Sequence, residues 1–166
     1  MSFLSARISP GNIATTDSVQ TLTNKTMQTA SMNNTLFNMV RETVTVNASS
    51  AGGTINYDTQ TNGVILYTVN ATGNIVLNFR ATNLATLASV LPIGQSISVV
   101  LLVTNGGTAY YVTSVQVDGT TTGVTTRWQN AAPTTGNANS IDAYTFAITR
   151  TATSTYTVLA SQTKFA

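Results

Sequence analysis

The residues of this chain that could perform acid–base or metal chemistry are few, and three carboxylates are the main candidates. Asp58, Asp118 and Asp142 each lie near the end of a predicted strand, where Asp commonly serves turns. Two of them could form a glycosidase pair if the fold brought them about 5–9.5 Å apart. Asp118 or Asp142 could also bind calcium together with loop carbonyls, but the dense Asp spacing of a dedicated site is missing. We therefore interpret all three as turn residues, and expect no enzymatic activity, no cofactor and no metal.

The composition excludes several other classes of chemistry. The chain contains neither His nor Cys, which excludes a Ser-His-Asp triad, a thiolate nucleophile, a disulfide framework and imidazole or thiolate metal sites. Only 7% of the residues are charged, and the seven Lys and Arg residues are scattered, so nucleic acid is not an expected partner. The longest apolar run, 99–103, is too short to span a membrane, and the first ten residues lack the apolar stretch of a signal peptide. We expect no membrane partner.

Glycine-rich segments and aromatic residues offer weaker signals. The segments 47–53 and 104–107 lack the Lys and the following helix of a phosphate-binding loop, and we interpret them as turns. Tyr57, Tyr110 and Trp128 are the aromatic side chains that could stack on a sugar. For Trp128, which follows Arg127 and precedes a loop, sealing the edge of the fold is the favoured interpretation.

From residue 40 onward the chain has the pattern of short strands separated by turn residues. The segment 84–91 has Leu at helical spacing and predicts one or two helical turns, stopped by Pro92. Asn105-Gly106-Gly107 favours a hairpin, and a second hairpin is expected to turn around 152–154. The pattern predicts an all-β domain at 40–166, an antiparallel β-sandwich of jelly-roll type with an extended N-terminal arm. The predicted strands are 40–46, 54–57, 64–69, 75–79, 96–104, 110–117, 123–128, 141–150 and 155–160.

The predicted core combines the apolar residues of these strands. Its members are Val64, Leu66, Ile75, Leu77, Phe79, Ile97, Val99, Leu101, Val103, Val115, Val117, Trp128, Tyr144, Phe146, Ile148 and Val158. The run Val99-Val100-Leu101-Leu102 is apolar on both faces of its strand. This indicates a sheet that is covered on each side, by the arm or by a neighbouring subunit.

Residues 1–39 have a different character. Their apolar residues follow neither a helical nor a strand period, and Pro10-Gly11 would break any element begun before it. Too polar to form a core yet dotted with apolar side chains, the segment is predicted to be an attachment arm, with a disordered tail as the alternative. The residues expected to dock it are Phe3, Leu4, Ile8, Leu22, Asn24 and Lys25.

Several segments together resemble structural proteins of tailed bacteriophages. The element TLTNKT within 19–27 is similar to one near the N-termini of many fibre and virion proteins. The segments 41–46, 54–58, 74–79, 126–146 and 156–166 resemble a β-domain of virion proteins from marine phages, especially cyanophages. The resemblance implies a homotrimer at the surface of a phage particle, a short fibre or a capsid decoration, with the arm bound to capsid, neck or tail proteins.

Two settings favour such a low charge: a saline medium, or many copies packed closely together, which would repel one another if they were strongly charged. Two other functions stay open at this point. One is a receptor-binding module that recognises a host surface glycan through Tyr57, Tyr110 and Trp128. The more remote one is a glycan-degrading enzyme that uses Asp58, Asp118 and Asp142.

Overall fold

The structure is a computed structural model that describes residues 35, 36, 38 and 40–165. The chain divides into two units, Met1–Met39 and Val40–Ala166, and the second contains all the described strands. The six residues predicted to dock the arm lie outside the described residues, so their role stays a prediction: Phe3, Leu4, Ile8, Leu22, Asn24 and Lys25.

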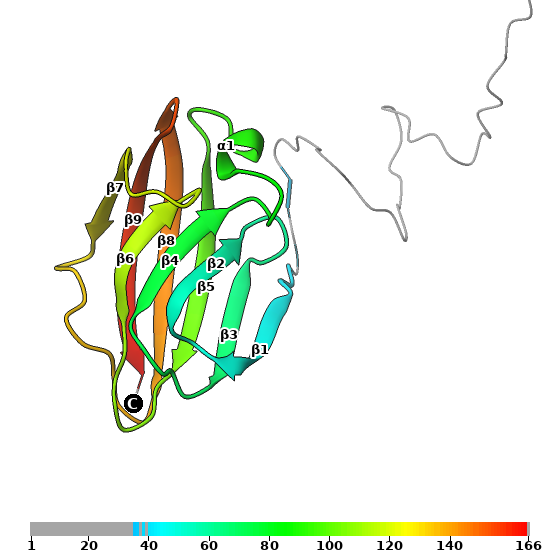
Figure 1. The fold of residues 1–166 in the computed structure, drawn as a ribbon. Coiled ribbons are helices and arrows are strands. Elements are labelled where there is room, and N and C mark those ends of the chain that lie inside the picture. Colours follow the sequence, from blue (N-terminus) through cyan, green and yellow to red (C-terminus); the bar gives the residue numbers. More distant parts are fainter. Residues whose placement is uncertain (1–34, 37, 39, 166) are drawn as a thin grey trace, which may run out of the picture. The chain divides into compact units, whose positions relative to one another are not determined.

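The unit from residue 40 onward consists of two β-sheets in two layers (Figure 1). The larger sheet has the strand order β1-β3-β5-β8-β9-β7, and the smaller sheet has the order β2-β4-β6. The strands are β1 (Val44–Ser50), β2 (Gly53–Asp58), β3 (Val64–Val69), β4 (Ile75–Arg80), β5 (Ser96–Thr104), β6 (Val112–Val117), β7 (Val124–Trp128), β8 (Ile141–Ala152) and β9 (Thr155–Phe165). The prediction of an all-β domain is confirmed.

The first six strands alternate between the two sheets as the chain proceeds. β1, β3 and β5 pair in parallel in the larger sheet, and β2, β4 and β6 pair in parallel in the smaller one. Each turn of this coil contributes one strand to each sheet. Parallel neighbours normally need a crossover, which is usually a helix, but here the crossover is a strand of the opposite sheet. The prediction of antiparallel pairing is therefore wrong for β1 to β6 and for β7 with β9, which pair in parallel, and it holds only for β5 with β8 and β8 with β9.

The two predicted hairpins had different outcomes. The hairpin at Asn105-Gly106-Gly107 is wrong, because β5 and β6 lie in different sheets. The buried Asn105 side chain instead holds the connection between them: its Nδ2 donates to the Tyr110 carbonyl (3.1 Å) and its Oδ1 accepts from the Tyr110 amide (3.0 Å). The hairpin of β8 and β9 is confirmed, with Ser154 in the left-handed region at its turn.

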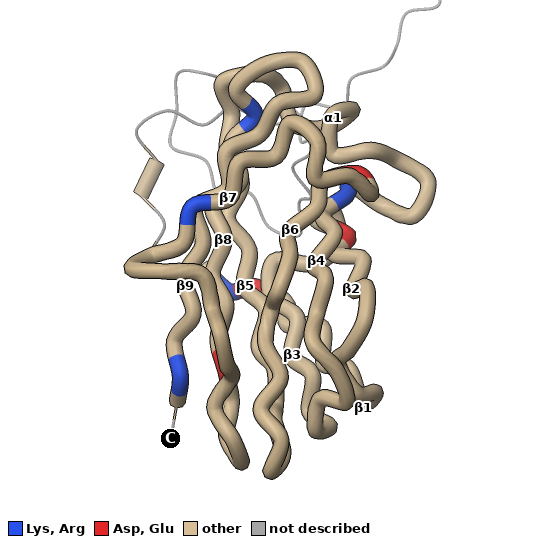
Figure 2. The backbone as a smooth tube through the Cα atoms, turned by 60° about the vertical axis from the view of Figure 1, so that its left-hand side comes forward, with Lys and Arg blue, Asp and Glu red and all other residues tan. Residues whose placement is uncertain are grey.

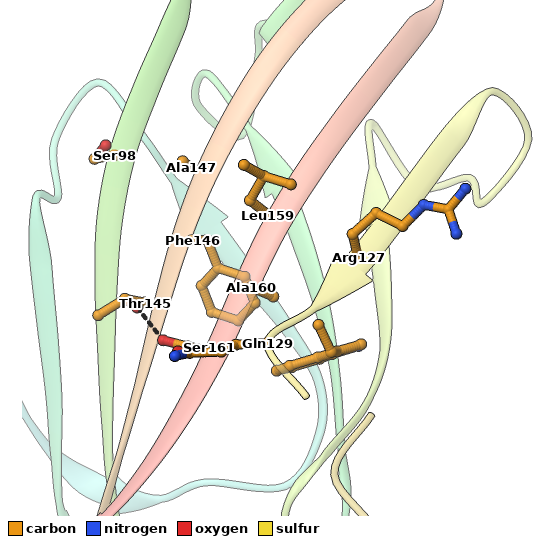
Figure 3. A pocket seen from close by; sticks show the side chains of 10 residues that line it. Ser98, Arg127, Gln129, Thr145, Phe146, Ala147, Leu159, Ala160 and Ser161 are labelled. Atoms are coloured by element: carbon orange, nitrogen blue, oxygen red, sulfur yellow. Dashed lines mark hydrogen bonds between the residues drawn. The ribbon is translucent and has the colours of Figure 1, made fainter. Parts of the chain in front are cut away.

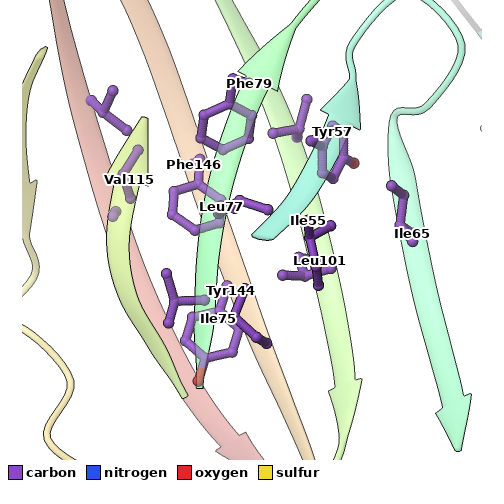
Figure 4. Packing of buried hydrophobic residues seen from close by; sticks show 14 of the residues in the cluster. Ile55, Tyr57, Ile65, Ile75, Leu77, Phe79, Leu101, Val115, Tyr144 and Phe146 are labelled. Atoms are coloured by element: carbon purple, nitrogen blue, oxygen red, sulfur yellow. The ribbon is translucent and has the colours of Figure 1, made fainter. Parts of the chain in front are cut away.

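The core lies between the two sheets (Figure 4). Phe79 of β4 meets Phe146 of β8 edge to face at a centroid distance of 5.1 Å, and Tyr57 of β2 lies 5.6 Å from Phe79. Most of the predicted core is buried, but β3 is turned over. It buries Ile65 and Tyr67, while Val64 and Leu66, predicted as core, point to the outer face of the larger sheet. Ile97 and Trp128 are only partly buried against the core.

One helical turn, α1 (Leu87–Val90), covers one end of the core with the buried Leu87. Asp118 fixes its first turn, because the Asp118 carboxylate accepts hydrogen bonds from the amides of Leu87 (2.7 Å) and Ala88 (3.4 Å). The predicted helix therefore exists as one turn, and Leu84 lies outside it with 92% of its surface exposed. Within the described part of the chain, no helix is long and apolar enough to cross a membrane.

Candidate functional site

The three carboxylates considered for catalysis each have a partner of their own within the fold. Asp58 at the end of β2 forms an ion pair with Arg80 at the end of β4, and Asp118 caps α1. Asp142, near the start of β8, lies beside Asn105 at the connection between β5 and β6. Among the described residues, no three His, Cys, Asp or Glu side chains gather as they would around a metal ion. Asp118 thus caps a helical turn, Asp58 forms an ion pair and Asp142 is a buried hydrogen-bond acceptor, so each of the three has a role within the fold.

Among the described residues, Asp142 is the one carboxylate that is fully buried. Its Oδ2 accepts hydrogen bonds from Asn105 Nδ2 (3.2 Å), the Asn137 amide (3.0 Å) and Gln162 Nε2 (3.2 Å), whereas its Oδ1 has no partner. Burial raises the pKa of Asp142 above its ordinary value, against the opposing effect of these donors and of the Lys164 charge. The cluster joins β8, β9 and two connections, and we interpret it as structural.

The three aromatic candidates for glycan contact do not form a common site. Tyr57 is fully buried, and its hydroxyl donates to the carbonyls of Gly63 (2.8 Å) and Val100 (3.0 Å). It is therefore a core residue and cannot stack on a sugar, which corrects the expectation for this position. Tyr110 lies in the connection before β6 and is partly buried against the core.

Trp128 has the sealing role that its position favoured. It is partly buried at the end of β7, the edge strand of the larger sheet. Its ring lies edge to face with Tyr144 (6.4 Å) and Phe146 (6.0 Å), which is a favourable geometry for aromatic pairs.

The outer face of the larger sheet, which points away from the core, is the most unusual surface of the domain. The pairing of β1, β3 and β5 aligns six outward aliphatic side chains in two rows of three, and we call this set the aliphatic belt. One row is Val44, Val64 and Val100, and the other is Val46, Leu66 and Leu102. Val46 is 63% exposed, and the residues on β3 and β5 are half-buried. Ala143 of β8, paired with Leu102, extends the second row.

Beyond the belt, the outer face is covered mainly by hydroxyl groups. Thr145 of β8 and Ser161 of β9 share a hydrogen bond, and Thr149 of β8 bonds to Ser96 of β5. At the outward positions of these six strands, as fixed by their register, Arg127 is the only charged residue. The charges of the described residues are also sparse along the backbone as a whole (Figure 2).

An open groove of about 440 Å³ lies on the same face, over β5, β8, β9 and β7 (Figure 3). Leu159, which is 56% exposed, provides its main aliphatic side chain. The polar lining consists of the Thr145–Ser161 hydroxyl pair, the Gln129 amide and the Arg127 guanidinium. Trp128 also lines the groove, so it is the one predicted glycan-contact residue that this surface includes.

The sequence contains one signal for this surface, the strand 96–104 with apolar residues on both faces. It gave no signal that Val44 and Val46 would lie in the same two rows, because that depends on parallel pairing between segments about 20 residues apart. Comparison of the chain with protein-family models, with curated proteins and with solved structures finds no match.

Proposed function

We propose that this chain is a structural protein of a bacteriophage virion, a short fibre or a capsid-surface decoration protein. In this proposal residues 1–39 are an extended arm that binds capsid, neck or tail proteins, and residues 40–166 are a β-sandwich domain displayed as a homotrimer on the particle. The proposal rests on the resemblance described above and on the character of the domain, whose acids serve as caps, ion pairs and buried acceptors.

The observation that carries the proposal is the aliphatic belt. A monomeric protein rarely exposes a contiguous apolar patch larger than a few hundred Å², and larger patches usually mark contacts with other proteins. The belt consists of adjacent aliphatic side chains without titratable groups. A contact made by such side chains does not depend on pH, which suits a permanent interface. When several copies form one oligomer, each arm needs only a modest affinity for the particle. Once one arm is bound, the oligomer keeps the remaining arms close to their sites and so raises their effective concentration.

Deletion of residues 1–30 tests the role of the arm. We expect the shortened protein to keep the β-rich circular dichroism spectrum of the full chain, because all described strands begin at Val44 or later. We expect it to lose incorporation into particles, because the arm supplies the contacts with the other virion proteins. The measurement is sedimentation of particles assembled with either protein, followed by quantification of the protein in the pellet.

A matched control replaces Leu84 by Ser. Leu84 lies outside the arm and is 92% exposed, so this variant should sediment with particles as the unmodified chain does. Retention of the shortened protein on particles at the level of the full chain would contradict the proposed arm.

A second candidate function is recognition of a host glycan, and the groove over β5, β8, β9 and β7 favours it. The groove combines an aliphatic residue, an indole and hydrogen-bonding groups, which is a suitable lining for a sugar. Replacing Arg127 by Ala removes an exposed donor without disturbing the core. If the chain is a receptor-binding module, this variant should lose at least about 10-fold in adsorption to host cells, because it loses one hydrogen bond from a charged group. A purely structural protein predicts no change.

A further inference from the structure

The outer face of the larger sheet has the size of a protein–protein interface. Its six strands contain between 5 and 12 residues each. With a rise of about 3.3 Å per residue and a strand spacing of about 4.8 Å, the face covers about 800 Å². This is about the area that one partner buries in a stable complex of standard size.

The charges of this face determine which partner suits it. A partner with a strongly acidic or basic surface would gain nothing from the belt and would lose hydration of its own charges. Arg127 is the only charged residue at the outward positions of this face, so two identical faces that meet bring at most one pair of like charges into the contact. Hydroxyl groups flank the belt and can donate as well as accept, which lets such a surface be complementary to itself.

Among the described strands, the edge of the sheet beside the belt is unpaired. Natural edge strands usually carry Lys, Pro or inward charges that prevent pairing with other chains. β1 has the sequence VTVNASS, without a charge or a proline, and of the described strands it pairs only with β3. A second copy whose contact on the belt extends beyond β1 would also cover this edge.

From these observations we infer that the outer face of the larger sheet, centred on the aliphatic belt, is covered by a second copy of this chain. The inference rests on the proposed function, since it names the surface through which the proposed homotrimer assembles. The belts of the three copies would surround the threefold axis, so that the outer face of each copy is shared between its two neighbours and the smaller sheet lies outermost.

The test replaces Val46 by Lys in the full chain and measures the molar mass by light scattering at micromolar concentration. The Val46 side chain points outward from an edge strand and is 63% exposed, so the variant should fold. The unmodified chain is expected to have about three times its monomer mass of 17.4 kDa. A desolvated ammonium group in each contact should weaken self-association by at least about 10-fold. Leu84→Lys is the matched control, since Leu84 is also exposed but lies outside the larger sheet, and it should assemble normally.

A second measurement uses the absence of cysteine in the chain. Val46→Cys and Leu84→Cys each introduce a single thiol, and their rates of reaction with a maleimide can be compared as the protein concentration rises. We expect protection of at least about 10-fold at position 46 on assembly and none at position 84. A wild-type monomer, equal labelling at both positions, or normal assembly of Val46→Lys would overturn the inference. A dimer protected at position 46 would support this surface and contradict the trimer of the proposed function.

Discussion

Replacing Phe79 by Ala is expected to lower the free energy of unfolding by about 3–5 kcal/mol, the range for truncating a fully buried aromatic residue. Phe79 of β4 is completely buried and is the aromatic contact between the two sheets, since it meets Phe146 on the larger sheet and Tyr57 on its own. The loss includes the transfer free energy of the ring and the cavity left among neighbours that cannot collapse. Because a domain of this size is stable by only about 5–15 kcal/mol, the variant should be close to unfolding.

Urea denaturation followed by circular dichroism measures this effect, with all variants at the same protein concentration, since self-association adds to apparent stability. Leu84→Ala is the control. It also removes a large apolar side chain, but one that is 92% exposed, so its free energy of unfolding should change by less than about 0.5 kcal/mol. A Phe79→Ala variant as stable as Leu84→Ala would show that the sheets do not pack through this ring.

The position of each strand was predictable because strands leave a local signal. The predicted runs 64–69 and 96–104 coincide with β3 and β5, and the other strands were located with shifts at their ends. The partner of each strand was not predictable in the same way. Ala51 and Gly52 separate β1 from β2, as a two-residue hairpin loop would, yet they carry the chain from one sheet to the other. A short glycine-containing connection is compatible with both geometries, and only the packing of the finished sheets decides between them.

The face of a strand was predictable only where one face is polar. In β4, Ile75, Leu77 and Phe79 alternate with Val76, Asn78 and Arg80, of which two are polar. All three alternating apolar residues are buried, as predicted. In β3 the run is apolar throughout, so alternation cannot tell which face is inward. The prediction selected Val64 and Leu66 for the core, but the structure places them in the belt. The error and the belt have the same cause, a sheet that is apolar on both faces.

One strand of the sequence predicted that a covered apolar surface exists, but the sequence did not predict how far this surface extends. Val100 and Leu102 belong to the two-sided apolar run that predicted a covered sheet, and both lie in the belt. The correction for Tyr57 depends on contacts that no local pattern contains. Its hydroxyl bonds to the carbonyl of Val100, which is 43 residues away in the sequence.

Replacing Asp142 by Ala is the second change for which we expect a large loss, about 1–3 kcal/mol of unfolding free energy at pH 7. The substitution removes the acceptor of three hydrogen bonds, those from Asn105 Nδ2, the Asn137 amide and Gln162 Nε2. Asn105 Nδ2 keeps the Tyr110 carbonyl, and Gln162 Nε2 keeps the Thr135 carbonyl and the Tyr144 hydroxyl, so the loss comes mainly from the Asn137 amide, whose bond is not replaced. Asp142→Asn keeps an acceptor oxygen, so it should retain more stability than Asp142→Ala. Denaturation of the two variants and of the unmodified protein gives these differences directly.

The dependence of stability on pH separates the role of the Asp142 charge from that of its hydrogen bonds. Burial raises the pKa of Asp142 in the folded state, so between the unfolded and the folded pKa the native protein holds more protons than the unfolded chain. The part of the Asp142 contribution that is linked to its proton is therefore full below the unfolded pKa, near 4, and is lost as the pH rises through the folded pKa, whereas the hydrogen bonds that its oxygen accepts are lost only on substitution. Asn does not titrate, so subtracting the unfolding free energy of Asp142→Asn from that of the unmodified protein cancels the effects of the other acids. This difference should fall as the pH rises from about 3 to 7. A difference that rises over the same range would mean that the buried site favours the carboxylate, with the three donors and the Lys164 charge outweighing burial.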